Sequence, residues 1–426
     1  MPGRPGGRSA PRILSAMFSR RLKWPCPPNR LSRLLDEKRT RPTRLFDLTE
    51  SNPTRAGLSY PAEAIAAALA DPGVASYEPS ARGLESARAA VAEDATRRGR
   101  PVPLDRVVLT ASTSEAYALL FKLLADPGET VLVPRPSYPL FDYLAALEGL
   151  RVATYPLVHD DRFSIDLDHI ERALEGPGVA PPRAVVLVNP NNPTGTALRR
   201  GERSRLQEIC AGRGAALISD EVFFDYLDSG EVGEAARSGD PIVSAVSAQA
   251  PGFAGQAGGA LTFALGGLSK ACGLPQMKLG WIVADGPGKA VSEALERLDL
   301  IADTYLSVGT PVMRAAGRLI EIGAAIRSAI GRRLAANLEA LRGRLGPGSA
   351  CRLLRRDGGW YVVLQVPAIV PEEDLVVSLL SEDDVLVHPG YFFDFPSEAY
   401  LVMSLLPEPA EFDEAIRRVL ARVDRR

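Results

Sequence analysis

Short apolar runs alternate with longer helix-like stretches through the middle of the chain, from about Tyr77 onward. The run at 184–188 (A-V-V-L-V) is apolar on both faces, as a buried parallel strand is. Helix-like segments of ten or more residues separate several of the runs. This alternation predicts an α/β domain with a mostly parallel sheet and helices on both faces. The predicted strands are 107–109, 131–133, 184–188, 216–218, 261–265 and 281–283.

The pattern changes after about Ser307. Residues 311–345 predict one long helix, or two in tandem, and strand-like runs follow at 360–366, 385–388 and 400–405. These features indicate a smaller α+β domain, to which the first seventy-odd residues contribute. The Gly/Ala/Ser-rich segment 228–259 predicts a long surface loop. We therefore expect a basic, disordered leader at 1–35, an N-terminal arm at 36–76 that forms part of the small domain, a large domain at 77–307 and the rest of the small domain at 308–426.

The expected leader contains eight Lys or Arg and no Asp or Glu, which is the composition of a mitochondrial transit peptide. Prolines at positions 2, 5 and 11 would break an amphipathic helix before Ile13. We therefore favour a disordered leader, or a functional chain that begins near Met17.

The composition of the chain argues against several classes of protein function. Fifty basic residues face fifty-two acidic ones in the 426-residue chain, so no large basic excess is present to bind nucleic acid. No run of about 18 apolar residues predicts a membrane span. The four cysteines show no C-x-x-C spacing and the three histidines are far apart, which argues against a disulfide framework and a metal site. We expect a cytoplasmic protein.

The first chemical motif follows the strand at 107–109. Ser112-x-x-Glu115 before an apolar helical run forms a capping box, which puts Ser112, Thr113 and Ser114 at a helix N-terminus. Backbone N–H groups and the helix dipole make such a position an anion site. The signal is weak alone, because most such sequences only cap a helix.

Three further motifs follow predicted strands. The loop 189–195 (N-P-N-N-P-T-G) comes after strand 184–188, Asp220 ends the next strand, and Lys270 follows strand 261–265 in the sequence G-G-L-S-K. Ligands bind at the carboxyl ends of the strands in open α/β sheets. Small neighbours can desolvate the lysine and lower its pKa, as an amine nucleophile requires. An anion cradle, a carboxylate and a lysine together match the needs of pyridoxal 5′-phosphate (PLP): a phosphate site, a partner for the pyridine nitrogen and an amine for the aldehyde.

From about Leu48 to the C-terminus, the chain resembles the class I/II aminotransferases, PLP-dependent enzymes of fold type I. The motifs that carry the resemblance are S-T-S-E-A, P-S-Y-P, N-P-N-N-P-T-G-T, S-D-E-V and L-S-K-x-x-G-L-P-Q-M-K-L-G-W, in that order. The resemblance implies a large domain with a mostly parallel sheet flanked by helices, and a smaller α+β domain.

The resemblance also implies residue roles. Lys270 forms the Schiff base and shuttles the proton, Asp220 pairs with the pyridinium nitrogen, and Tyr138 stacks on the ring. Asn192 bonds the cofactor's 3-oxygen and lies near the substrate carboxylate. Tyr77 reaches the phosphate from a second subunit, which implies a homodimer. The remaining cofactor-binding residues are Ser112, Thr113, Ser114, Ser269 and Lys278, the last where the family usually has an arginine.

Four departures from the family pattern stand out. Phe223 replaces a tyrosine, Gly267 replaces a phosphate-binding serine, and the stretch from Asp220 to Lys270 is long. Val402 replaces the arginine that clamps the substrate α-carboxylate. Arg55 is the candidate substitute, although a solvated loop arginine is the simpler interpretation; an amine substrate, or an amino acid held by another group, stays open. Trp281 and Trp360 are expected in the core.

The resulting hypothesis is an aminotransferase that moves an amino group from an amino acid to a 2-oxo acid through the Lys270 Schiff base and pyridoxamine phosphate. A PLP-dependent lyase or decarboxylase on the same scaffold is the first alternative, because fold does not fix reaction type. A non-catalytic PLP-binding protein is the second. The sequence does not name the donor or the acceptor.

Overall fold

The structure is a computed structural model that describes residues 18–19, 21, 29–40, 44–176, 180–246, 259–346 and 348–425. Most of the expected leader lies outside the described residues. Helix α2 (Arg30–Arg39) begins within the region expected to be disordered, because Asn29 caps it by accepting the Ser32 N–H at 2.7 Å. Residues 30–35 are therefore helical, which corrects that part of the expectation.

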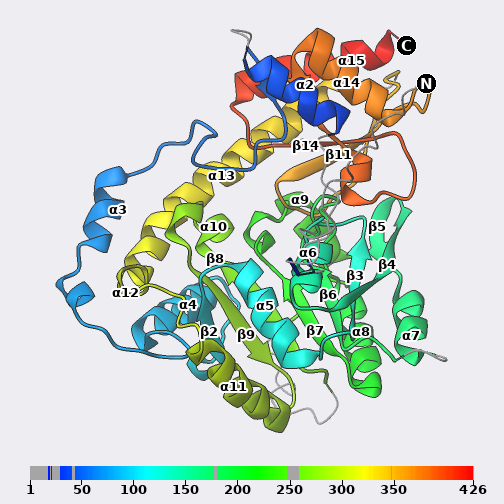
Figure 1. The fold of residues 1–426 in the computed structure, drawn as a ribbon. Coiled ribbons are helices and arrows are strands. Elements are labelled where there is room, and N and C mark those ends of the chain that lie inside the picture. The colour runs from blue at the N-terminus through cyan, green and yellow to red at the C-terminus, as the bar shows by residue number, and fades with distance from the viewer. Residues whose placement is uncertain are drawn as a thin grey trace, which may run out of the picture.

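An eight-stranded mixed sheet forms the large domain, in the order β2-β9-β8-β7-β6-β3-β4-β5 (Figure 1). The strands from β8 to β4 run parallel, whereas β9 runs antiparallel to both of its neighbours and β5 antiparallel to β4. All six strands expected from the sequence are present. Two more, β4 and β5, were not predicted. The strands are β2 (Val107–Thr110), β3 (Thr130–Arg135), β4 (Arg151–Asp160), β5 (Arg162–Ile165), β6 (Ala184–Val188), β7 (Ala216–Asp220), β8 (Thr262–Gly267) and β9 (Gly280–Asp285).

Alternate residues of each central strand enter two different hydrophobic clusters, one on each face of the sheet. In β6, Val186 packs with residues of helices α5, α6 and α11, while Val185 and Leu187 pack on the other face with residues of α4, α7 and α8. This is the two-sided cover that the sequence predicted. The helices are α4 (Glu85–Arg97), α5 (Thr113–Leu124), α6 (Phe141–Leu147), α7 (Leu167–Glu175), α8 (Arg200–Arg213) and α11 (Gly288–Asp303).

The small domain contains a four-stranded antiparallel sheet and a parallel pair, β1 with β12. The N-terminal segment joins it, since Lys38 of α2 pairs with Asp384 and the Leu48 carbonyl accepts the Ser404 N–H at 2.7 Å. Figure 1 shows α13 running from this domain down the side of the large one. Its elements are β1 (Phe46–Asp47), β10 (Arg352–Leu353), β11 (Tyr361–Gln365), β12 (Val385–Leu386), β13 (His388–Pro389), β14 (Tyr400–Ser404), α13 (Ala316–Arg344), α14 (Glu372–Asp383) and α15 (Pro409–Asp424).

Two expectations for single segments need comment. The predicted helix at 311–345 is the tandem form, with α12 (Thr310–Arg314) followed by α13. The predicted loop 228–259 contains a helix, α9 (Ser229–Arg237), so that expectation was wrong in its first third; residues 247–258 are not described. The remaining helices are α3 (Ala62–Leu69) and α10 (Leu268–Ala271). The expected domain boundaries stay predictions.

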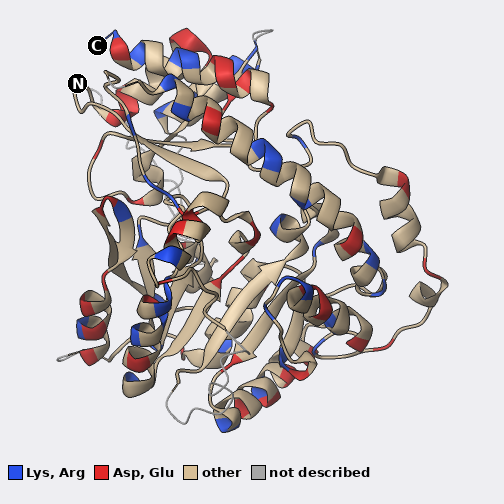
Figure 2. Ribbon diagram, turned by 180° about the vertical axis from the view of Figure 1, so that it is seen from behind, with Lys and Arg blue, Asp and Glu red and all other residues tan. Residues whose placement is uncertain are grey.

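None of the described helices is long and apolar enough to cross a membrane. Acidic and basic residues are mixed along the outer helices that Figure 2 shows. Within the described ranges, no group of three or more His, Cys, Asp and Glu could hold a metal ion.

Candidate active site

The motif residues meet at one edge of the large sheet. β2, β6, β7 and β8 all run in the same direction, so their carboxyl ends lie together. Thr113 follows β2, Asn192 lies in the loop after β6, Asp220 ends β7, and Lys270 lies in α10 directly after β8. The fold thus brings together four of the predicted site residues.

Lys270 lies in a largely apolar setting. Its Nζ is 3.5 Å from the Ser51 carbonyl oxygen and 4.7 Å from the centroid of the Trp360 ring. The Tyr226 hydroxyl fixes its backbone by donating to the Lys270 carbonyl at 2.7 Å. Burial lowers the pKa of Lys270 to about 8, although the charges of Asp220 and Glu50 act in the opposite direction. A substantial fraction of the amine is therefore neutral near physiological pH.

Asp220 is the second buried ionisable group at this edge. It accepts the Tyr117 hydroxyl at 3.3 Å and the Val222 N–H at 3.2 Å. Burial raises the pKa of Asp220 to about 6, against the effect of these hydrogen bonds and of Lys270. A cation bound beside it would relieve the cost of burying its charge.

Only one of the three asparagines in the loop after β6 is without a partner for its side-chain oxygen. Asn189 bonds the Leu198 N–H and the Val243 carbonyl, and Asn191 bonds Ser137, Pro136 and Thr194. Asn192 is buried, yet its Oδ1 has no hydrogen-bond partner among the described residues. Because such groups are nearly always paired in proteins, Asn192 is the asparagine that points to a ligand.

The N-terminus of α5 forms as the capping box predicts. Ser112 Oγ accepts the Glu115 N–H at 3.1 Å, and Glu115 Oε2 accepts the Ala111 N–H at 2.6 Å. The Ser112 hydroxyl is thus used by the helix, which leaves the N–H groups of Thr113 and Ser114 to face an anion.

Strand β9 approaches this turn closely. A Cβ at Gly280 would lie 3.0 Å from Thr110 Oγ1 and 3.2 Å from the Ser112 carbonyl carbon, so only glycine fits without a shift. Lys278 precedes this contact by two residues and its side chain is exposed. The backbone two residues after Lys278 therefore lies against the α5 N-terminus. Ser269 is half-buried and adjacent to Lys270.

Tyr138 lies on the same side of the sheet as α5 and α6. Its ring packs edge-on against Phe141, with the centroids 6.2 Å apart. Burial and the charge of Asp220 raise its pKa, which places the phenol within electrostatic reach of that carboxylate.

Two predicted residues are not gathered with the others. Tyr77 has 72% of its surface exposed. Arg55 is exposed, and its backbone N–H bonds the Asn52 carbonyl at 3.0 Å. No contact of either side chain with Lys270 or Asp220 is found in the described part of the chain.

Val402 is fully buried in β14, opposite Val363 of β11 and His388 of β13. Burial lowers the pKa of His388 to about 4, so this histidine is uncharged at neutral pH. The strand position that the sequence predicts to correspond to the family's arginine therefore offers no positive charge in this chain.

The small domain is joined to the asparagine loop by a set of contacts we call the Gly195 junction, formed by Gly195, Ala197, Arg199, Asp357 and Gly358. The Gly195 carbonyl accepts the N–H groups of Asp357 at 2.9 Å and Gly358 at 3.0 Å. The Asp357 carboxylate accepts the Ala197 N–H at 2.9 Å and pairs with the buried Arg199 at 2.5 Å. Gly195 has φ +71°, and a Cβ there would lie 2.6 Å from the Gly358 oxygen.

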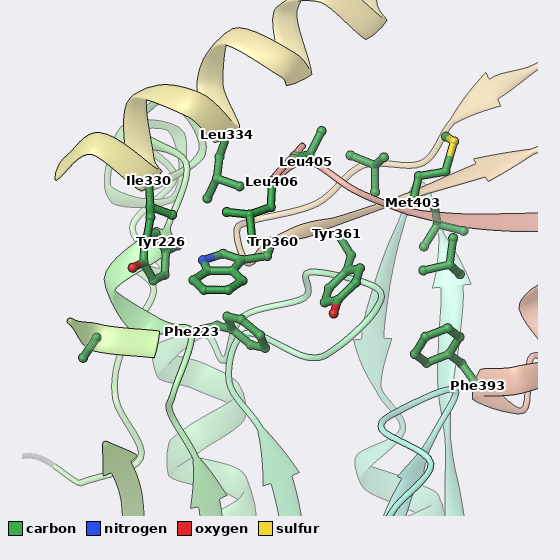
Figure 3. Packing of buried hydrophobic residues seen from close by; sticks show 14 of the residues in the cluster. Phe223, Tyr226, Ile330, Leu334, Trp360, Tyr361, Phe393, Met403, Leu405 and Leu406 are labelled. Carbon is green, nitrogen blue, oxygen red and sulfur yellow. The ribbon is translucent and has the colours of Figure 1, made fainter. Parts of the chain in front are cut away.

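Sequence reasoning missed several neighbours of Lys270. Ser51 and Tyr226 carried no signal, and neither did Tyr117, which donates to Asp220, because these contacts arise only when distant segments meet. Trp360 was expected in the core, and it is fully buried among the residues that Figure 3 shows, but one face of its ring also meets the lysine amine.

Comparison with known proteins identifies the family. The model of the family "Aminotransferase class I and II" matches residues 43–419. The chain belongs to the class I and II aminotransferases. This confirms the resemblance seen in the sequence, and with it the expectation of an aminotransferase-family enzyme.

Known relatives of this aminotransferase are distant. Glutamate-pyruvate aminotransferase AlaA of Haemophilus influenzae is 26% identical over 400 residues, covering 88% of this chain and 90% of its own length. Arginine–pyruvate transaminase AruH of Pseudomonas aeruginosa is 29% identical over 346 residues, covering 79% and 80%. Alanine aminotransferase from Pyrococcus furiosus shares the fold with a TM-score of 0.79 at 22% identity, covering 96% of this chain and 100% of that one. The fold type I architecture is thereby confirmed, while the substrate is not defined.

This family depends on PLP, and the residues present fit that cofactor. Asn192 Oδ1 is buried without a partner, Asp220 is a buried carboxylate able to hold a protonated ring nitrogen, and Lys270 offers an amine of lowered pKa. The free N–H groups at the α5 N-terminus suit a phosphate.

Proposed function

We propose that this aminotransferase binds PLP and transfers an amino group from an amino acid to a 2-oxo acid. The observation that carries the proposal is a lysine amine of lowered pKa beside a buried carboxylate, at the strand edge where the asparagine loop and the α5 N-terminus meet. When bound, PLP supplies an aldehyde that condenses with amines and a ring that withdraws electrons from the substrate carbon.

The protein residues have separate tasks in this proposal. Lys270 holds the cofactor and, when neutral, moves the proton of the substrate carbon, for which a pKa near the working pH is suitable. Asp220 keeps a proton on the ring nitrogen, and Asn192 bonds the ring oxygen beside it. Tyr138 stacks on the ring. The phosphate would be held by Thr113, Ser114, Ser269 and Lys278, with Ser112 supporting the helix turn that presents the N–H groups.

Arg55 is our candidate for the substrate carboxylate, since it lies four residues after Ser51, whose carbonyl oxygen meets Lys270. We also propose a homodimer in which Tyr77 reaches the partner's phosphate site, supported by its exposure. A cytoplasmic location is supported by Cys210, Cys272 and Cys351, which are buried free thiols.

The test is a single-turnover experiment with the purified holoenzyme and individual amino acids. We expect a donor to convert the cofactor to pyridoxamine phosphate, and a 2-oxo acid to restore it. Lys270→Ala should abolish the conversion, whereas Lys289→Ala, at an exposed lysine, should leave it unchanged. A protein that binds no added PLP would refute the proposal.

Val402 favours one second candidate, a PLP-dependent lyase or decarboxylase, because the usual carboxylate clamp is absent from its strand position. Release of ammonia and pyruvate from cysteine-type substrates, without pyridoxamine phosphate, would support a lyase. Release of carbon dioxide would support a decarboxylase.

A further inference from the structure

The amine of Lys270 lies against two aromatic rings that come from different domains. Its Nζ is 4.7 Å from the centroid of Trp360, at the start of β11, and 5.7 Å from that of Phe223, just after β7. The two rings are 5.4 Å apart and meet edge to face. Figure 3 shows Phe223 lying next to Trp360 in the buried cluster.

Packing alone fixes the indole of Trp360. The residue is fully buried, its ring lies 5.3 Å from that of Tyr226, and Ile330 and Leu334 of α13 lie above it in Figure 3. Its Nε1 is buried with no hydrogen-bond partner among the described residues. A buried indole N–H usually donates a hydrogen bond. Because this one donates none within the described part of the chain, packing contacts orient the ring. The ring offers the site its π face.

Few other groups can stabilise a charge on Lys270. Asp220 from β7 and Glu50 from the segment after β1 are the charged groups that act on it, and the Ser51 carbonyl is 3.5 Å away. The Tyr226 hydroxyl is used by the Lys270 backbone. Phe223 stands where the family usually has a tyrosine and brings no hydroxyl, so the aromatic faces take the place of a polar partner.

We propose that Trp360 is a positioning residue whose indole face, together with Phe223, holds the Lys270 ammonium whenever the lysine is not joined to the cofactor. A cation within about 6 Å of an indole centroid is attracted by the ring, and Trp attracts more strongly than Phe. The inference rests on the proposed function, in which the lysine amine is set free during each turnover and must return to the same carbon.

The contact has a chemical consequence. The ring favours the charged form of the amine and so opposes the effect of burial on its pKa. Weakening the ring–cation contact should lower the pKa of Lys270 below its present value of about 8. A residue that only filled space would not change the titration in this direction.

The experiment is an NMR titration of the apoprotein carrying lysine labelled with ¹³C at Cε. The chain has six lysines (Lys23, Lys38, Lys122, Lys270, Lys278 and Lys289), so the spectrum is simple, and the Lys270→Ala variant assigns the signal. We expect the pKa of Lys270 to fall in the order wild type, Trp360→Phe, Trp360→Leu. A fall of half a unit in the leucine variant corresponds to about threefold more neutral amine at neutral pH.

Trp281→Phe is the matched control, since it changes a buried tryptophan of β9 with no ring–cation contact to Lys270 among the described residues. An unchanged or raised pKa in Trp360→Leu overturns the proposal. If that variant does not fold, an unchanged titration in Trp360→Phe overturns it. Because the titration needs no cofactor, its failure is distinct from failure of the proposed function, which appears as a lack of PLP binding.

Discussion

Burial dominates the chemistry of Asp220. Its folded-state pKa of about 6 is above the ordinary value of 3.8, so protonation favours the folded state. The stability that this group contributes is therefore fully present below about pH 4 and is lost as the pH rises through about 6. The apoprotein therefore bears the cost of a carboxylate that it needs for its cofactor.

Asp220→Asn should remove that cost. At about pH 8.5, where much of Lys270 is neutral, we expect the apoprotein variant to be more stable than wild type by up to about 3 kcal/mol. At about pH 2.5 the difference should vanish, because the wild-type carboxyl is then protonated in both states. Urea denaturation at the two pH values measures it. Equal stability at the higher pH would contradict the burial argument, and PLP binding by the variant should be weaker in either case.

At this scale, the sequence predicted residue types better than their individual partners. It identified an asparagine-rich loop, but only the structure shows that Asn189 and Asn191 are bonded internally and that Asn192 has a free oxygen. It placed Trp360 in the core, correctly, yet the approach of Lys270 depends on how two domains meet. Such contacts have no local sequence pattern.

The start of α5 carries two functions on two serines, the helix cap at Ser112 and the proposed phosphate contact at Ser114, and they can be separated. Ser112→Ala should lower the free energy of unfolding of the apoprotein by about 1 kcal/mol, because it removes the bond to the Glu115 N–H. Ser114→Ala is the control, since this side chain is exposed and should leave stability unchanged. Urea denaturation of both variants is the measurement. Equal losses of stability would show that Ser112 is not the cap.

Among the elements, the buried strands were predictable from the sequence, whereas β4 and β5 at one edge of the sheet were not. β6 is apolar throughout and β7 is buried throughout, whereas β4 at the sheet margin mixes exposed and buried positions without a clear alternation. Polar side chains on an edge strand weaken the period-2 signal. Helix α9 was missed because Gly and Ser dilute its pattern within a segment rich in small residues.

For the whole molecule, the main prediction concerns the assembly of subunits. We expect a homodimer in which Tyr77 of one subunit serves the site of the other. Mixing Lys270→Ala subunits with Tyr77→Ala subunits should then restore about a quarter of wild-type activity at low PLP, because half of the dimers are hybrids and each hybrid has one intact site. Activity after subunit exchange is the readout.

The control is a variant that carries both substitutions on one chain. Its dimers contain no intact site, so the same exchange procedure should restore no activity. No recovery in a mixture shown to exchange subunits would mean that Tyr77 serves its own site or none.

For the whole molecule, the ordered motifs predicted the architecture, since each of them follows the end of a strand. They left the substrate open, because Val402 stands where the resemblance predicts the arginine that binds the substrate carboxylate.

The Gly195 junction links cofactor binding at the asparagine loop to the stability of the small domain. Hydrogen bonds join the loop that carries Asn192 to Asp357 and Gly358, shortly before β11, so we expect a ligand that orders this loop to order β11 as well. A ligand at a hundredfold excess over its dissociation constant adds about 2.7 kcal/mol to the stability of the state that binds it. Part of that stabilisation would reach the small domain through the junction. Slower hydrogen exchange in β11 would thus report cofactor occupancy in a strand of the small domain.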